Sequence, residues 1–147
     1  MNRFRFRLEN VLRYRGILEE EKKRVFGEAM RKLQHEEHKL NQLGTDLEDH
    51  EHLMTETSKG SISAHKLRNN YFYARSLDGK IRIQKKRIQD EEKVVDSKRS
   101  DLIESTKRKK IIERLKERHR EVHKQAQEKE EQGIVDELTS VRFKWKR

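Results

Sequence analysis

Apolar residues recur at every seventh position along two long stretches of this chain. One heptad position of the first stretch holds Phe26, Leu33, Leu40, Leu47 and Met54, and one of the second holds Leu67, Ala74, Ile81, Ile88, Val95 and Leu102. Because an α-helix completes a turn in roughly 3.6 residues, a spacing of seven keeps these side chains on one slowly drifting stripe. The pattern predicts two helices, each with a narrow apolar line typical of a coiled coil.

A single break separates the two stretches. Residues 57–63 are rich in Ser, Thr and Gly, and Ser61 or Ser63 could cap a following helix by accepting its free backbone N–H groups. We therefore expect one domain: a helix over about 8–57, a turn over 58–62, a second helix over 63–138 and a basic tail over 139–147. The predicted fold is all-α, an antiparallel coiled-coil hairpin whose second helix overhangs the first.

The expected seam is not uniformly apolar. Companion positions of the same heptads carry Glu36, His50, Gln84, Glu91 and Lys98, and polar residues at such sites reduce stability while fixing register. Near the start, Val11, Leu18 and Val25 keep the seven-residue spacing one residue out of register with the main line. We expect a marginally stable hairpin that gains order from its partners.

Composition supports this interpretation. Of 147 residues, 44% are charged and only 31% hydrophobic, which is too few to bury a globular core of this length. The same composition would suit a disordered chain, but the regular placement of the apolar residues argues against that. The chain has no cysteine, no signal-peptide-like start and no run near the roughly 20 apolar residues of a membrane span. We expect a soluble cytoplasmic protein.

The sequence offers no catalytic constellation. It has no phosphate-binding glycine loop and no nucleophile elbow, and a two-helix fold leaves no cavity for a catalytic acid or base. His35 with His38, and His50 with His52, lack an evident third metal ligand, so we interpret them as surface histidines. We expect no enzyme activity, cofactor, metal or small-molecule substrate.

A net charge of +10 raises the question of nucleic acid. The run from Lys107 to Lys110 could neutralise phosphates, but acidic residues are interleaved through the rest of the chain and no nucleic-acid-binding motif is present. A basic coiled coil that binds nucleic acid therefore stays open as an alternative function, and so does a homo-oligomeric coiled-coil scaffold.

Three clusters stand out from the heptads. Arginine and phenylalanine alternate over residues 3–7, and a period of two indicates an extended lead-in and not a helix. Tyr71, Phe72 and Tyr73 are consecutive, so at least one must point outward, either as a binding anchor or to pack against the first helix. The third cluster is the end of the chain, from Asp136 to Leu138 and from Arg142 to Arg147.

Together these clusters resemble the flagellar export protein FliJ family. The residues that carry the resemblance are Arg5, Phe6, Arg7, Leu8, Val11, Leu12, Arg13 and Arg15 at the start, Tyr73, Leu77 and Ile81 after the turn, and Asp136, Glu137, Leu138, Arg142 and Phe143 at the end. The resemblance spans nearly the whole chain, including its length and its single turn.

The resemblance implies a stalk-like antiparallel coiled coil of the flagellar type III export apparatus, similar to the central stalk of rotary ATPases. Such a protein regulates an enzyme without being one: it binds and stimulates the hexameric export ATPase, links it to the export-gate membrane protein and escorts export chaperones. It would thus serve flagellum biogenesis, motility and chemotaxis from the cytoplasmic face of the cell membrane. By the same resemblance, Val11, Leu12, Arg13 and Arg15 would contact the ATPase, and Tyr73 and Leu77 the export gate.

Overall fold

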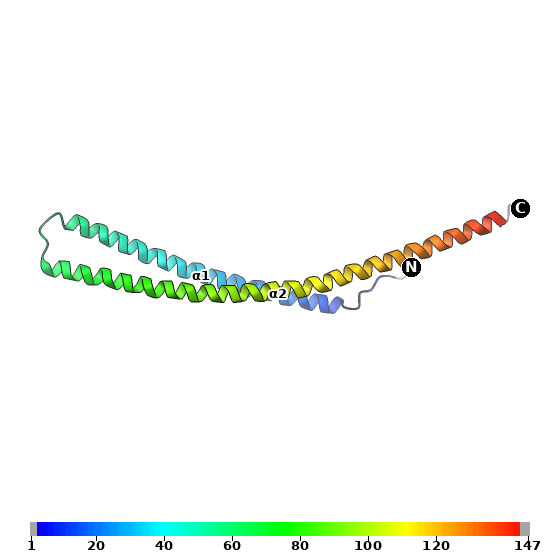
Figure 1. Ribbon diagram of the computed structural model, residues 1–147, viewed down its shortest axis with the longest axis horizontal. Helices are drawn as coiled ribbons and strands as arrows, with labels where there is room; N and C mark the ends of the chain where they lie inside the picture. Colours follow the sequence, from blue (N-terminus) through cyan, green and yellow to red (C-terminus); the bar gives the residue numbers. More distant parts are fainter. Residues whose placement is uncertain (1–2, 145–147) are drawn as a thin grey trace. The chain divides into compact units, whose positions relative to one another are not determined.

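A computed structural model describes residues 3–144 of the chain. These residues form two helices, α1 over Glu9–Thr57 and α2 over Ala64–Lys144, and contain no strand. The two helices run antiparallel and are joined by a short loop at residues 58–63 (Figure 1). The predicted all-α hairpin, with a second helix longer than the first, is confirmed.

The ends of the helices follow from local hydrogen bonding. At the end of α1 the backbone N–H of Ser58 donates to the carbonyl of Met54 (2.9 Å), and that of Gly60 donates to the carbonyl of Thr57 (3.4 Å). Ser63 caps α2, because its Oγ accepts from the backbone N–H of Lys66 at 3.3 Å. With no proline to interrupt it, α2 continues past Leu138, where we expected a basic tail, to Lys144. Residues 145–147 of that tail lie outside the described residues.

The chain divides into two compact units. The hinge unit comprises Glu21–Leu102, and the terminal unit comprises the residues up to Glu20 with those from Ile103 onward. Each unit contains a part of α1 and a part of α2. Each therefore has its own seam between the two helices.

The seam of the hinge unit lies on the predicted heptads. Leu77 and Val95 of α2 are each only 3% exposed, and they belong to the two heptad lines read from the sequence. Between them Gln84, 5% exposed, donates from Nε2 to the backbone carbonyl of Glu36 (2.9 Å) and to its Oε2 (2.6 Å). This polar layer ties facing positions of the two helices, and its residue numbers fit the register expected for a turn near Gly60.

Further ion pairs border this seam. Lys32 Nζ lies 2.7 Å from Glu91 Oε1, and this hydrogen bond raises the pKa of Lys32. The carboxylate of Glu36 also accepts from Lys39 Nζ at 2.8 Å. The hydrogen bonds from Lys39 and from Gln84 together lower the pKa of Glu36 to about 2. Polar groups at these seam positions are therefore paired in the folded state.

Candidate functional site

Residues 3–7 of the terminal unit form an extended segment that lies over α2, and we call this segment the strap. Phe6 is 6% exposed and meets the ring of His119 edge-on, with 5.9 Å between ring centroids. Phe4 meets His123 in the same way at 5.5 Å. Because His119 and His123 are four residues apart on α2, they lie on one face of the helix and receive alternate residues of the strap. The extended lead-in expected from the period of two is confirmed.

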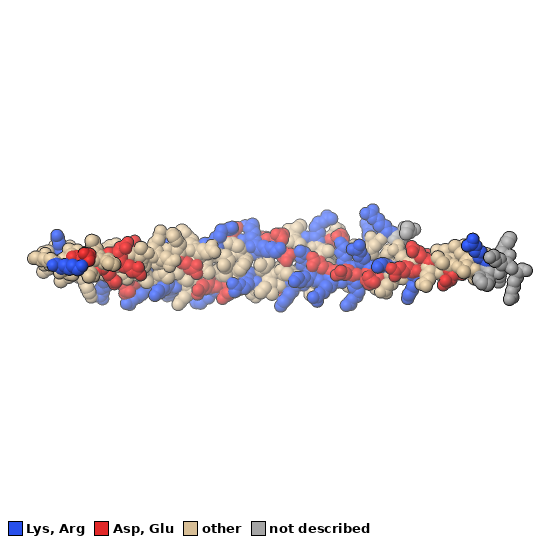
Figure 2. All heavy atoms as spheres, turned by 90° about the horizontal axis from the view of Figure 1, so that it is seen from above, with Lys and Arg blue, Asp and Glu red and all other residues tan. Residues whose placement is uncertain are grey.

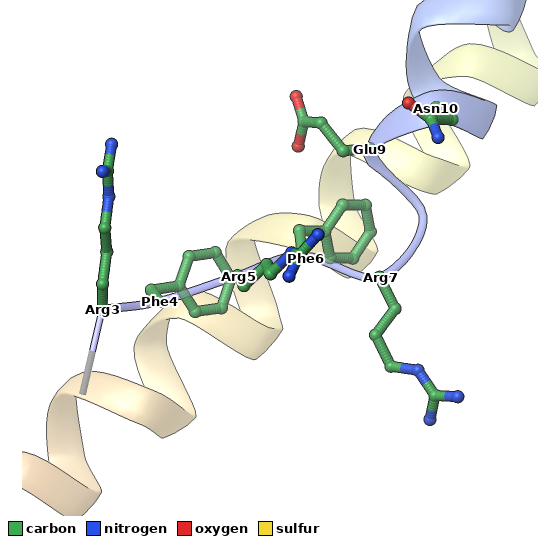
Figure 3. A pocket seen from close by; sticks show the side chains of 7 residues that line it. All are labelled: Arg3, Phe4, Arg5, Phe6, Arg7, Glu9 and Asn10. Atoms are coloured by element: carbon green, nitrogen blue, oxygen red, sulfur yellow. The ribbon is translucent and has the colours of Figure 1, made fainter.

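The arginines of the strap are left exposed by this arrangement. Arg3, Arg5 and Arg7 are exposed, and Arg3 and Arg7 project to opposite sides of the strap (Figure 3). Together with Phe4, Phe6, Glu9 and Asn10 they line an open hollow. The aromatic residues thus anchor the strap while its guanidinium groups remain available to an acidic partner.

A charged layer pairs the helices next to the strap. Glu19, 5% exposed, accepts from Thr106 Oγ1 at 2.9 Å and from Lys109 Nζ at 2.8 Å. The hydrogen bond from Glu19 raises the pKa of Lys109, so this lysine stays charged. Further toward the chain start, Lys116 Nζ donates to Glu9 Oε1 at 2.9 Å. Charged side chains therefore occupy the seam of the terminal unit.

The four residues expected to bind the ATPase lie on the first two turns of α1 but do not share one surface. Arg13 is exposed, and Val11 is 38% exposed. Leu12 and Arg15 are half-buried, because they occupy the two heptad lines that face α2 in this unit. Arg13 and Val11 are therefore more accessible to a partner than Leu12 and Arg15 are.

Beyond the strap, α2 continues with its surface uncovered. Every residue from 128 to 142 is exposed, including Ile134, Leu138 and Val141. The sequence predicted an overhang, but it did not place the strap over residues 119–123. A turn near Gly60 places Leu8 opposite the region of Ile112, but the strap covers α2 as far as His123, so the uncovered part of α2 begins later.

The two residues expected to bind the export gate behave differently from each other. Tyr73 is 50% exposed and meets the ring of His50 edge-on at 4.7 Å, and Nε2 of His50 lies 3.1 Å from the carbonyl oxygen of Asn70. Leu77, one turn further along α2, is buried in the seam. The exposed neighbours of Tyr73 are Tyr71 and Phe72, which contact each other edge-on at 6.0 Å. The exposed surface here is aromatic, and Leu77 is not part of it because it is buried.

Sequence reasoning missed the structural roles of Glu19, His119 and His123. All three are polar residues on heptad lines that face the other part of the chain, so an apolar pattern could not reveal them. The sequence does carry one indication that Glu19 lies in the seam. The seven-residue line through Leu12, Glu19 and Phe26 continues the main seam, whereas the line through Val11, Leu18 and Val25 does not.

Lys and Arg side chains are interspersed with Asp and Glu over the visible face (Figure 2). Within residues 3–144, no group of three or more His, Asp or Glu side chains could hold a metal ion. No helix in this part of the chain combines the length and the apolar character needed to cross a membrane.

Comparison with known proteins gives one match. The family described as flagellar FliJ protein matches residues 4–147, which is nearly the whole chain. No curated protein and no solved structure matches the chain.

Proposed function

Because the chain belongs to the flagellar FliJ protein family, which serves flagellar protein export without being enzymatic, we propose that it binds and stimulates the export ATPase through its terminal unit. One observation supports this assignment above the others. The terminal unit combines exposed arginines with a helical segment, residues 128–142, whose whole surface is uncovered. A helix that is exposed on all sides suits insertion into a ring of subunits.

Basic side chains supply the second part of the proposal. Arg13 on α1 and the strap arginines Arg3, Arg5 and Arg7 are exposed, and no cross-helix ion pair of theirs occurs within the described residues. Contacts made by exposed charges are individually weak, so the ATPase could shift between orientations on this surface. Weak, exchangeable contacts favour turnover over permanent attachment.

The stimulation can be tested with the purified export ATPase. We expect Arg13→Glu to abolish most of the stimulation, and Arg13→Glu with Arg15→Gln to abolish it further while helicity by circular dichroism stays unchanged. A matched control is Lys86→Glu with Arg87→Glu, which reverses two exposed charges in the hinge unit. Unchanged stimulation by the Arg13 variant would remove the terminal unit from the proposal.

The proposal includes a second contact at the hinge unit. Exposed Tyr73, with its neighbour Phe72, would bind the export-gate membrane protein and thereby hold the chain at the cytoplasmic face of the membrane, where it would escort export chaperones. Leu77 would support this surface without touching the partner. In a pull-down with the purified gate protein, Phe72→Ala with Tyr73→Ala should reduce binding strongly. Exposed Ile83→Ala should leave it intact, and equal binding by both variants would argue against the assignment.

A further inference from the structure

The last part of α2 carries an apolar stripe on the side that the strap covers nearer to α1. We call residues 128–142 the end segment. Three of its side chains share this stripe and are each at least half exposed: Ile134, Leu138 and Val141. They follow His123, which meets Phe4 of the strap, by about three, four and five helical turns. The stripe therefore continues the line of α2 that faces the strap.

The strap ends before this stripe begins. Arg3 and Phe4 line a hollow together with His123 and Gln127, and every residue from 128 to 142 is exposed. The uncovered length of helix is roughly 21 Å, at about 1.5 Å per residue. A second helix laid along it would lie end to end with the strap and would continue the helix pair of the terminal unit.

The end of the chain carries opposite charges in its two halves. Residues 128–137 contain five acidic side chains and one basic one, whereas residues 138–147 contain four basic side chains and no acidic one. A second copy laid antiparallel brings each half opposite the half of the other sign, and a parallel copy brings like charges together. The charge pattern of this segment is thus complementary to itself in the antiparallel orientation.

We infer that two copies of this protein associate through their end segments, as an antiparallel helix pair with two-fold symmetry. When Ile134 of one copy faces Leu138 of the second copy, the same contact recurs in return, because a two-fold interface is identical from both sides. In this register Glu131 lies beside Arg142 of the second copy. Both side chains are exposed, and neither forms an ion pair within the described part of the chain.

The contact closes at two copies and leaves the strap in place. In the same register, Lys144 of the second copy reaches the level of Glu128, one residue beyond Gln127 at the end of the strap. Each stripe is used once, so no surface of this kind remains for further growth. Only three apolar side chains of each copy meet, so the association is weak and requires a high protein concentration.

The dimer goes beyond the proposed function and does not depend on it. It covers residues 128–142, which the proposed function assigns to insertion into the ATPase ring, so the two associations exclude each other. The ATPase would then bind only the monomer. Association of the purified chain is measured without the ATPase, so a failure of one proposal is distinguishable from a failure of the other.

Sedimentation of the full-length chain over a wide range of concentrations tests the association. We expect a monomer that forms a dimer as the concentration rises. Leu138→Glu replaces an apolar side chain at the centre of the contact in both copies, and it should raise the dissociation constant at least about tenfold. Thr139→Glu adds the same charge at an exposed neighbour that points away from the stripe. This control should change the dissociation constant by less than about twofold.

Reversing single charges tests the pairing of Glu131 with Arg142. Glu131→Arg and Arg142→Glu each place like charges opposite each other, so each variant alone should dimerise about threefold more weakly, or worse. An equimolar mixture of the two variants should recover the affinity of the natural chain, because each introduced charge then meets its opposite. Circular dichroism should show natural helicity in every variant, since all the substituted positions are exposed.

The orientation can be measured with spin labels, because the chain contains no cysteine and single labelling sites are easily introduced. Labels on Thr139→Cys lie near the two-fold axis and should be close together in the dimer. Labels on Glu128→Cys lie at opposite ends of the contact and should be separated by roughly 24 Å along the helices.

Three results would overturn the inference. A natural chain that stays monomeric at every concentration would exclude the second copy as the occupant of the stripe. A dimer that Leu138→Glu leaves unchanged would place the contact elsewhere. Short distances between labels at both positions would show that the two copies pair in parallel, against the charge pattern of the segment.

Discussion

In the hinge unit, Leu77 and Val95 are buried in the seam, with the polar layer of Gln84 between them, whereas in the terminal unit the facing residues are Glu19, Lys109, Glu9 and Lys116. Among the described residues of the terminal unit, Phe6 of the strap is the only buried apolar side chain. The same two helices are thus held by apolar burial in one unit and by charge pairs with an aromatic strap in the other. In water, burying apolar side chains stabilises a helix pair more than ion pairs near the surface do.

This difference assigns different roles to the units. The hinge unit contains the buried apolar side chains of the seam, Leu77 and Val95. The terminal unit has exposed surfaces and polar contacts that a partner can replace. It can therefore rearrange at a low cost in free energy when a partner binds. Stability and binding are therefore concentrated in different parts of one hairpin.

The largest expected effect on stability comes from truncating a buried side chain of the apolar seam. Leu77→Ala should lower the free energy of unfolding by about 3 kcal/mol, because it removes a side chain that is 3% exposed. Ile83→Ala, at a site 59% exposed, should change it by less than about 0.5 kcal/mol. Urea denaturation followed by circular dichroism measures both values. Equal values would show that the seam is not what stabilises the hinge unit.

A smaller and more local effect is expected from the strap. Phe6→Ala should cost about 1 to 2 kcal/mol, less than a phenylalanine in a globular core, because the strap packs on one helix only. Hydrogen exchange should show the loss of protection around His119 and His123, with the hinge unit unaffected. An equal loss of protection in both units would contradict the different roles assigned to them.

The smallest expected effect is on the dependence of stability on pH. The pKa of Glu36 is lowered to about 2 from 4.5, so its contribution to stability is present above about pH 4.5 and is lost as pH falls through about 2. Glu36→Gln should therefore flatten the dependence of the unfolding midpoint on pH between these values. Glu37→Gln, at an exposed neighbouring position, is the matched control and should leave the dependence as it is. An identical acid response in both variants would exclude Glu36 as its source.

The sequence was sufficient for the hinge unit because apolar residues there repeat at seven-residue intervals on both helices. The register also followed, since a turn near Gly60 pairs Glu36 with Gln84 and His50 with Asn70, as found. The layer of Gln84 and Glu36 was visible as polar residues at heptad positions. Heptad counting therefore recovered both the elements and their pairing in this part of the chain.

The terminal unit was harder to predict for a physical reason. Its seam uses Glu19, Lys109 and Lys116, which are ordinary surface residues in any composition-based interpretation. The strap meets histidines, whose contact with a phenylalanine leaves no periodic signal. Leu77 was a candidate contact residue through the family resemblance, but the period that makes it a seam residue also buries it. Pattern alone did not decide between these two roles.

The loop at residues 58–63 has a practical consequence. Ser63 fixes the start of α2 from within the loop, and no described glycine, Gly60 included, needs a positive φ angle. Residues 58–61 are exposed, and the backbone N–H groups of residues 58–60 donate to carbonyls in the last turn of α1. An epitope or fluorescent label inserted after Lys59 should therefore be tolerated, and it would make the protein traceable in living cells without altering either end of the chain.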